Sequence, residues 1–495
     1  MFSLMESALD AVGAAEDDLL DEATLAIREA DLHRRTGRVV DLIGLITEAT
    51  GLEAEVGEVC TIETGRGRAS VPAEVVGFRQ GRTLLMPLGE PKGIGPGSKV
   101  VATGQPLKVD VSDALLGRAL DGLGNPLDGK GPIEHTSWYP AEQAPPDPLS
   151  RPRIHERVSL GVRSLDAFVP CGRGQRIGIF AGSGVGKSSL LGMIARSTSE
   201  EINVICLVGE RGREVLEFMQ RDLGEEGLAR SVVVCATSDQ PALVRLKAAF
   251  TATAIAEYFR DQGKNVMMMM DSVTRFAMAQ REVGLAIGEP PATRGYTPSV
   301  FAMLPKLLER TGTSPSGSIT ALYTVLVDGD DMNEPIADAV RGILDGHIVL
   351  SRHLAHAGHY PAVDVLASVS RLVGEITTPD VRAAGNEVRK LMATYKEKAD
   401  LISIGAYQPG SDPQIDAAIE ARDPIDGFLK QLVTEPSSAE SADATLAQLA
   451  QLSGTWEAPV LNGHVIDPAA AMAAGNGADG GMPLHNAIPP LHIPS

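Results

Sequence analysis

The chain has 495 residues, of which 43% are hydrophobic and 22% are charged, a composition that excludes a largely disordered protein. At about 150 residues per domain, this length predicts about three domains. The formal net charge of −20 argues against broad electrostatic binding of nucleic acid, which requires basic surfaces, and aromatic residues at 4% leave few platforms for stacking bases.

The first 34 residues predict an acidic amphipathic helix. Residues 1–31 hold nine acidic residues against one arginine, a net charge of −8. Such a helix at a terminus is typical either of an arm that binds a partner or of a solvated, partly frayed end, and the residues leave both interpretations open. Its apolar positions recur at helical spacing and are Leu4, Ala8, Ala11, Val12, Leu19, Leu20, Ala23 and Ile27.

Short β-rich runs with glycine-containing breaks between them occupy residues 35–105. This pattern predicts a small β-barrel or sandwich. The turn-rich stretch 117–132 and the proline-rich stretch 140–152 predict a linker that wraps onto the next domain. The predicted strands of the first region are 39–43, 56–62, 73–78 and 83–88.

Continuous apolar strands alternate with helical patterns in the next region, residues 106–385. This alternation predicts a mainly parallel sheet with helices on both faces, and its strands are predicted at 176–180, 204–208, 232–236, 266–270, 319–327 and 348–350. Residues 386–455 predict a helical domain. Its helices are expected around 388–399, 415–421, 425–433 and 445–452. Residues 456–495 are rich in Ala, Gly and Pro and predict a flexible tail.

The expected compartment is the cytoplasm. The four cysteines are far apart in the sequence, which indicates reduced thiols rather than a zinc site or disulfide framework. No apolar run approaches the length of a membrane span. The acidic N-terminus is also unlike a secretory signal, which begins with basic residues.

The strongest motif lies between the predicted strand 176–180 and a helical run at 189–196. Its sequence is Ala-Gly-Ser-Gly-Val-Gly-Lys-Ser, and strand, glycine-rich loop, Lys-Ser and helix is the context of a phosphate-binding P-loop. Backbone N–H groups would surround the phosphate, Lys187 would reach the β- and γ-phosphates, and Ser188 would ligate Mg²⁺. The predicted nucleotide-binding residues are Ala181, Gly182, Ser183, Gly184, Val185, Gly186, Lys187, Ser188 and Ser189.

Two carboxylates at strand ends are candidates for the chemistry of ATP hydrolysis. Asp271 ends the apolar run 266–270, where a second carboxylate can hold the Mg²⁺ shell, although such a residue can also be a helix cap. Glu210 lies just past the strand 204–208, where a carboxylate can polarise the attacking water. Glu214, one helical turn later, is an alternative, and both glutamates could instead pair with neighbouring arginines.

Several motifs together resemble the α/β family of rotary ATPases, and within it the flagellar type III export ATPases. They are the P-loop, Gly209–Arg211, Met270–Arg275, Ala279–Phe301, Gly329–Asp338, Pro361–Ser370 and Lys398–Tyr407. The similarity covers about residues 35–435. It implies a RecA-like P-loop ATPase core of the α/β class at 106–385, an N-terminal β-barrel at 35–105 and a C-terminal helical domain at 386–455. Ala181 stands where the general P-loop motif has glycine, and Ala-Gly-Ser-Gly favours the flagellar branch. The chain departs from the family in its long tail and in its strongly acidic arm.

The resemblance implies a role for each matching residue. Glu210 is then the catalytic carboxylate, and Arg275 lies near the γ-phosphate. Arg371, which by itself indicates only a surface cation, becomes an arginine finger that reaches the site of a neighbouring subunit. Tyr360 resembles the aromatic residue that packs on adenine, and Tyr407 closes the same pocket.

The resemblance also implies partners and cofactors. Since Glu210 and Arg371 occur in one chain, every subunit can offer both a site and a finger, which favours a homo-hexamer that binds ATP and Mg²⁺. The arm at residues 1–34 would bind a regulatory, stator-like export subunit. The ring would contact a central-stalk-like subunit, an export gate and chaperone-bound export substrates, at the periphery of the inner membrane.

Three alternatives remain at this stage. The first is the same enzyme in a virulence type III secretion system, a sister family that shares most of the motifs. The second is an RNA-translocating hexamer, which requires a basic barrel rich in aromatic residues. Residues 37–101 contain cations, among them Arg66, Arg68, Arg79, Arg82, Lys92 and Lys99, but Phe78 is their only aromatic residue. The third is a regulatory nucleotide binder without hydrolysis, against which Glu210 argues.

Overall fold

The computed structural model describes residues 35–65, 70–327, 329, 331–454 and 456. They form two compact units. The first comprises the described residues up to Thr377 together with Phe428–Ala442, and the second comprises Thr378–Gly427 and the described residues from Asp443. The predicted arm at 1–34 and nearly all of the predicted tail lie outside the described residues. Within the described part, no helix is long and apolar enough to cross a bilayer.

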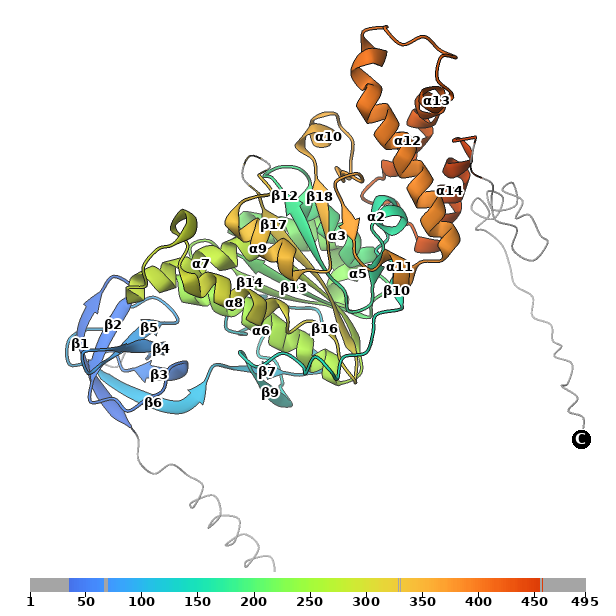
Figure 1. The fold of residues 1–495 in the computed structure, drawn as a ribbon. Coiled ribbons are helices and arrows are strands. Elements are labelled where there is room, and N and C mark those ends of the chain that lie inside the picture. Colours follow the sequence, from blue (N-terminus) through green and yellow to red (C-terminus); the bar gives the residue numbers. More distant parts are fainter. Residues whose placement is uncertain (1–34, 66–69, 328, 330, 455, 457–495) are drawn as a thin grey trace, which may run out of the picture. The chain divides into compact units, whose positions relative to one another are not determined.

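A closed six-stranded antiparallel barrel begins the first unit (Figure 1). Its strands run in the order β1-β2-β5-β4-β3-β6. The β4–β5 hairpin turns at Gln80 and Gly81, whose φ angles of 51° and 74° are those of a two-residue turn that matches the twist of paired strands. The strands are β1 (Thr36–Ile43), β2 (Ile46–Thr50), β3 (Glu58–Ile62), β4 (Val71–Arg79), β5 (Arg82–Pro87) and β6 (Lys99–Pro106).

Strand β2 was missed by the sequence patterns because a charged residue occupies its buried face. Glu48 is 6% exposed, and its carboxylate pairs with Arg79 at 2.6 Å and with Arg82 at 2.7 Å. The two arginines flank the β4–β5 turn, so the charge is satisfied within the barrel. A short strand whose polar residue is buried shows no alternation of apolar and polar residues.

A nine-stranded, mainly parallel sheet forms the larger part of the first unit. Its path is β19-β18-β12-β17-β15-β13-β14-β8, and β16 pairs with β17. All six strands predicted for this region are present, and the predicted fold class is confirmed. The strands are β8 (Arg118–Asp121), β12 (Arg176–Ala181), β13 (Ile202–Val208), β14 (Ser231–Ala236), β15 (Asn265–Asp271), β16 (Gly312–Thr313), β17 (Ser318–Leu326), β18 (Gly346–Leu350) and β19 (Val369–Ser370).

Helices cover both faces of this sheet (Figure 1), and their apolar faces bury strands such as the four-methionine segment of β15. The helices of the first unit up to Thr377 are α2 (Arg163–Phe168), α3 (Lys187–Ser197), α4 (Gly212–Glu217), α5 (Gly224–Ala229), α6 (Ala242–Asp261), α7 (Val273–Ile287), α8 (Pro298–Leu308), α9 (Pro335–Ile343), α10 (Arg352–His356) and α11 (Val373–Ile376). Short helical segments are η1 (Asp113–Leu115), η2 (Phe218–Leu223) and η3 (Thr293–Gly295). Two small sheets pair β7 (Lys108–Val111) with β9 (Ser137–Pro140), and β10 (Arg157–Val158) with β11 (Cys171–Gly172).

Two predictions about secondary structure need correction. The turn-rich stretch 117–132 is not only a linker, because β8 within it pairs in parallel with β14 at the edge of the sheet. The predicted helices 415–421 and 425–433 are one helix, α13 (Pro413–Leu429), which continues through Pro424. The other C-terminal helices are α12 (Pro379–Ser403) and α14 (Ala439–Gln451).

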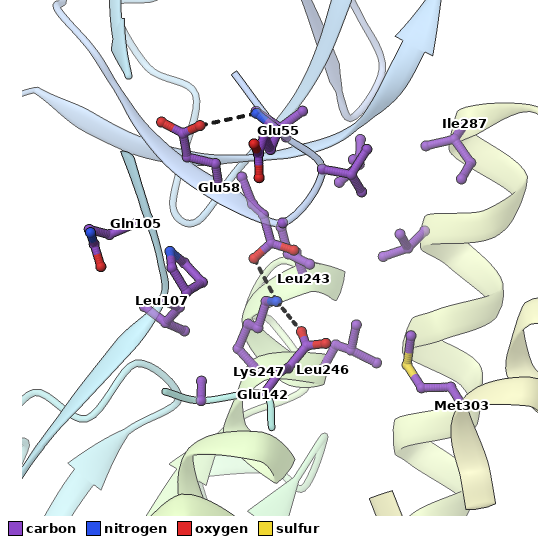
Figure 2. Close-up of a pocket in the computed structure, with 18 of the residues that line it drawn as sticks. Glu55, Glu58, Gln105, Leu107, Glu142, Leu243, Leu246, Lys247, Ile287 and Met303 are labelled. Atoms are coloured by element: carbon purple, nitrogen blue, oxygen red, sulfur yellow. Dashed lines mark hydrogen bonds and ion pairs between the residues drawn. The ribbon is translucent and has the colours of Figure 1, made fainter. Parts of the chain in front are cut away.

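A buried lysine ties the barrel to the α/β sheet. Lys247 of α6 is 3% exposed, and its ammonium lies 2.6 Å from Glu74 of β4 and 2.5 Å from Glu142 of the linker. Figure 2 shows Lys247 between Glu142 and the barrel, beside a cavity of about 580 Å³. Burial raises the pKa of Glu74, and the charge of Lys247 opposes that shift. The cation therefore stabilises a carboxylate that the barrel buries.

Replacing Lys247 with methionine is expected to lower the free energy of unfolding by about 3–5 kcal/mol, because it leaves Glu74 buried without a cation. Urea unfolding of the full chain measures the change. Glu142→Gln is the matched control; Glu142 is half exposed, so its loss is expected to cost within about 1 kcal/mol. Equal, small effects of both substitutions would contradict a structural role for the buried pair.

Candidate active site

The predicted site residues gather where parallel strands end. The P-loop follows β12, Glu210 follows β13, and Asp271 is the last residue of β15. Strand β17 lies between β12 and β15, and β13 is the next strand after β15. The carboxyl ends of parallel strands meet at one edge of a sheet, which is where ligands bind in such folds.

The P-loop has the backbone geometry of an anion cradle. Gly184 and Gly186 have φ angles of 79° and 89°, a region that favours glycine. Among the described residues, no acceptor is recorded for the backbone N–H groups of Gly184, Gly186 and Lys187. These N–H groups precede or begin the eleven-residue helix α3, whose dipole favours an anion at this end. Ser188 is exposed and so is accessible to a ligand.

Lys187 brings the two predicted carboxylates together. Its Nζ lies 2.5 Å from Asp271 Oδ1 and 3.8 Å from Glu210 Oε1. The side chains are 13%, 5% and 16% exposed, respectively. A lysine and two carboxylates from three different strand ends thus share one partly buried space.

The environment of Glu210 raises its pKa to about 7. The largest cause is burial, which disfavours the charged carboxylate, followed by the negative charge of Asp271. Lys187 and Arg275 lower the pKa, whereas a hydrogen bond with Glu214 raises it. Such a shift is typical of a carboxylate that exchanges protons near neutral pH.

Arg275 and Tyr360 also lie at this edge. Arg275 packs beside Gly209, the residue that precedes Glu210. A Cβ added to this glycine would lie 3.2–3.4 Å from the Arg275 side chain. The Nε of Arg275 is buried and has no hydrogen-bond partner among the described residues. A Cβ at Gly186 would lie 3.3 Å from the Tyr360 ring. Tyr360 is 45% exposed and offers that ring beside the P-loop.

Arg371 lies at the amino end of strand β18, on the side of the sheet opposite to the carboxyl ends that carry the P-loop. Its backbone N–H donates to the carbonyl of Asp345 at 3.0 Å, and Asp345 directly precedes β18. Leu350, at the far end of β18, is the residue level with Ala181. Five residues of strand span about 16 Å, farther than an arginine side chain extends. The structure therefore does not place Arg371 near the P-loop of its own chain.

Tyr407 belongs to the second unit. Its hydroxyl interacts with Asp416 Oδ1 at 2.9 Å and with the Asp412 carbonyl at 3.0 Å. Its predicted role in closing a nucleotide pocket stays a prediction.

The residues of the site fit a nucleotide-bound magnesium ion. No group of three or more His, Cys, Asp or Glu side chains that could hold a metal alone is found among the described residues. Mg²⁺ commonly binds through one or two protein ligands plus substrate phosphates. Exposed Ser188 beside the pair formed by Lys187 and Asp271 supplies that kind of incomplete oxygen set.

One neighbour of this site was missed by the sequence patterns. Thr324 of β17 is fully buried, and its hydroxyl donates to Asp271 Oδ1 at 2.8 Å. The available signal was a threonine within the run 321–327, whose other residues are aliphatic apart from Tyr323. Nothing local indicates its partner, because Asp271 lies 53 residues earlier.

Three protein-family models match this chain between residues 39 and 451, with residues 105–160 and 371–376 unmatched. The nucleotide-binding domain of the ATP synthase alpha/beta family matches residues 161–370, and the beta-barrel domain of the same family matches residues 39–104. The T3SS EscN ATPase C-terminal domain matches residues 377–451.

Individual relatives are similar over most of their length. A flagellum-specific ATP synthase of Bacillus subtilis is 58% identical over 86% of this chain and 97% of its own. A type 3 secretion system ATPase of Xanthomonas euvesicatoria is 51% identical over 85% and 94%, respectively. The structure of the assembled ATPase EscN from enteropathogenic E. coli matches with a TM-score of 0.80 and 47% identity over 84% of this chain and all of that one. A second structure contains EscN with its central stalk EscO, with a TM-score of 0.78 and 47% identity over the same shares.

Proposed function

The chain belongs to the ATP synthase alpha/beta family and is an ATPase of its protein-export branch, and we propose that it couples Mg²⁺-dependent ATP hydrolysis to flagellar type III protein export. The convergence of Lys187, Glu210 and Asp271 at one sheet edge is the observation that carries the hydrolytic part. Flagellum-specific relatives at 50–58% identity carry the flagellar part.

We propose that ATP binds across the P-loop with its adenine beside Tyr360. The N–H groups of the loop and Lys187 would bind the phosphates, and Ser188 and Asp271 would hold the magnesium shell. The ion would neutralise charge on the β- and γ-phosphates. Arg275, with its unpartnered Nε, would add a positive charge on the same side.

Glu210 is the proposed catalytic carboxylate. It orients and polarises the attacking water, accepting a proton as the water attacks the γ-phosphate. Its mixed surroundings suit this task, since Lys187 and Arg275 favour the charged form while burial favours the neutral one.

Arg371 is proposed to act in a neighbouring subunit. Its distance from the P-loop of its own chain supports a head-to-tail arrangement of subunits. In this arrangement, the surface of one copy that carries Arg371 faces the P-loop of the next copy. Closure of such contacts gives a ring, and a homo-hexamer is the proposed assembly. The assembled EscN structure supports an oligomer of this kind.

The remaining partners follow from the proposed export role. A central-stalk subunit would contact the ring, as in the EscN–EscO complex. A stator-like subunit would bind the arm at 1–34, and the ring would sit in the cytoplasm, at the periphery of the inner membrane below an export gate. There it would release export substrates from chaperones and help them unfold and enter the gate.

The alternatives are less well supported. In the barrel, Arg79 and Arg82 pair with Glu48, and Lys99 pairs with Glu63, which leaves few free cations for RNA phosphates among the described residues. A virulence secretion role fits the fold equally, but it is not better supported by the relatives than flagellar export.

A motility assay tests the export role. In a strain from which this chain has been deleted, the wild-type chain is expected to restore flagellar filaments and swimming, and Glu210→Gln is expected to restore neither. Restored ATPase activity without filaments, together with secretion of virulence substrates, would support the sister function instead.

The rate of hydrolysis is expected to depend on pH through Glu210. Above its pKa of about 7 the residue is a carboxylate that can polarise water, and below it the residue is a neutral acid. The pH dependence of kcat/KM reports the pKa values of groups in the free enzyme. This ratio should therefore rise from about pH 6 to about pH 8 and then level off. Glu214→Gln removes a carboxyl group that raises the pKa of Glu210, so in this variant kcat/KM should rise at lower pH than in the wild type. A flat wild-type profile would contradict the assignment.

A further inference from the structure

Thr324 is held rigidly beside the proposed magnesium carboxylate. Strand β17 pairs with β12 on one side and with β15 on the other. In these registers Thr324 is level with Ile179, and the preceding Tyr323 is level with Met270. The hydroxyl of Thr324 therefore emerges between the strand that leads to the P-loop and the strand that ends in Asp271. It is fully buried and lies 2.8 Å from Asp271 Oδ1.

Asp271 has two donors on the same oxygen, and they differ in stiffness. Lys187 reaches Oδ1 at 2.5 Å through a flexible side chain whose ammonium is also the proposed phosphate ligand. Thr324 reaches the same atom from a β-branched side chain, which has few rotamers, on a strand fixed on both sides. The bond from Thr324 is thus the one that does not depend on what Lys187 binds.

We propose that Thr324 is a positioning residue that holds Asp271 in the orientation needed for the magnesium shell. The inference deepens the proposed function, since it rests on the metal role of Asp271. By donating to Oδ1, the hydroxyl fixes the rotation of the carboxylate and leaves Oδ2 for the water shell of the ion. Partners that orient a metal-binding carboxylate in this way commonly contribute 10–100-fold to metal affinity.

A second threonine of the same strand provides a matched control. Thr320 is also fully buried, and its hydroxyl donates to the buried carboxylate of Glu200 at 2.7 Å. It precedes Thr324 by four residues, which is two strand repeats, toward the amino end of β17 and away from the P-loop edge. Thr320→Val and Thr324→Val therefore each remove a buried bond from a hydroxyl to a carboxylate, and only one of these bonds involves the proposed site. Thr320→Val also removes the acceptor of the Gly174 backbone N–H, which donates to the Thr320 hydroxyl at 2.8 Å.

The experiment measures ADP binding to the full chain by calorimetry, with Mg²⁺ and with a chelator. Thr324→Val is expected to weaken the affinity in Mg²⁺ by about 10–100-fold and to leave the affinity in chelator unchanged. Thr324→Ser keeps the hydroxyl and should bind as the wild type does in both conditions. Thr320→Val should lower the melting temperature at least as much as Thr324→Val does, without changing the response to Mg²⁺.

Two results would overturn the proposal. One is a Thr324→Val chain whose affinity in Mg²⁺ equals that of the wild type, and the other is an equal loss with and without Mg²⁺. If the valine variant does not fold, Thr324→Ala removes the same hydroxyl without adding a methyl group. A wild-type chain that binds ADP equally well with and without Mg²⁺ would show instead that the proposed metal site itself is wrong.

Discussion

Replacing Arg371 with alanine is expected to lower kcat by about 10³–10⁵-fold, the range typical of an arginine finger. The physical reason is the loss of a positive charge that faces the phosphoryl group in the transition state. Because Arg371 lies on the side of the sheet opposite to its own P-loop, it is not expected to contribute to binding by an isolated chain. The affinity of the isolated chain for ADP should therefore be unchanged.

Steady-state hydrolysis at a protein concentration that supports assembly measures this effect. Arg341→Ala is the control, because Arg341 is a neighbouring cation whose guanidinium pairs with Asp338 in its own helix at 2.7 Å. Its loss should change kcat little. An Arg371→Ala enzyme that retains wild-type kcat in the assembled state would remove the finger from the mechanism.

Replacing Glu210 with glutamine is expected to lower the hydrolysis rate by about 10²–10⁴-fold, the usual contribution of a general base. Glutamine keeps the size of the side chain but cannot accept the proton from water. Nucleotide binding should be retained, since Lys187 keeps its pair with Asp271 and the P-loop is unchanged. Single-turnover hydrolysis with excess enzyme separates the chemical step from binding and product release.

Glu214→Gln is the matched variant for this prediction. Glu214 lies four residues after Glu210, in helix α4. It is 37% exposed and pairs with Arg211 at 2.9 Å. At high pH, where Glu210 is ionised in both chains, Glu214→Gln should react almost as fast as the wild type. A larger loss from Glu214→Gln than from Glu210→Gln would transfer the catalytic role to Glu214.

The parts of the site that were predictable are those with a local signal. The P-loop carries its own strand, glycines and helix start, and Glu210 and Asp271 each follow an apolar run. Chain order alone then brings them together, because parallel strands end at one edge. Most strands of the barrel and of the sheet were predictable for the same reason, because they are short apolar runs with turn residues between them. Strand β6 was not among the predicted strands of the barrel.

The parts that were not predictable depend on pairing between distant segments. Thr324 is an unremarkable residue of a buried strand until the order β12-β17-β15 places it against Asp271. The position of Arg371 follows from the antiparallel pairing of β19 with β18, which places it far from its own P-loop. Strand β2 was hidden by the buried charge of Glu48, and β8 by the turn residues around it.

The most direct test of the account mixes two inactive chains. Glu210→Gln lacks the proposed catalytic carboxylate but keeps the finger, and Arg371→Ala keeps the carboxylate but lacks the finger. If active sites are shared between neighbours, random mixing at equal amounts makes about one quarter of the interfaces complete, and about that fraction of wild-type ATPase activity should return. Activity that stays at the level of the separate variants, while the mixed chains assemble normally, would contradict a site completed by a neighbouring subunit.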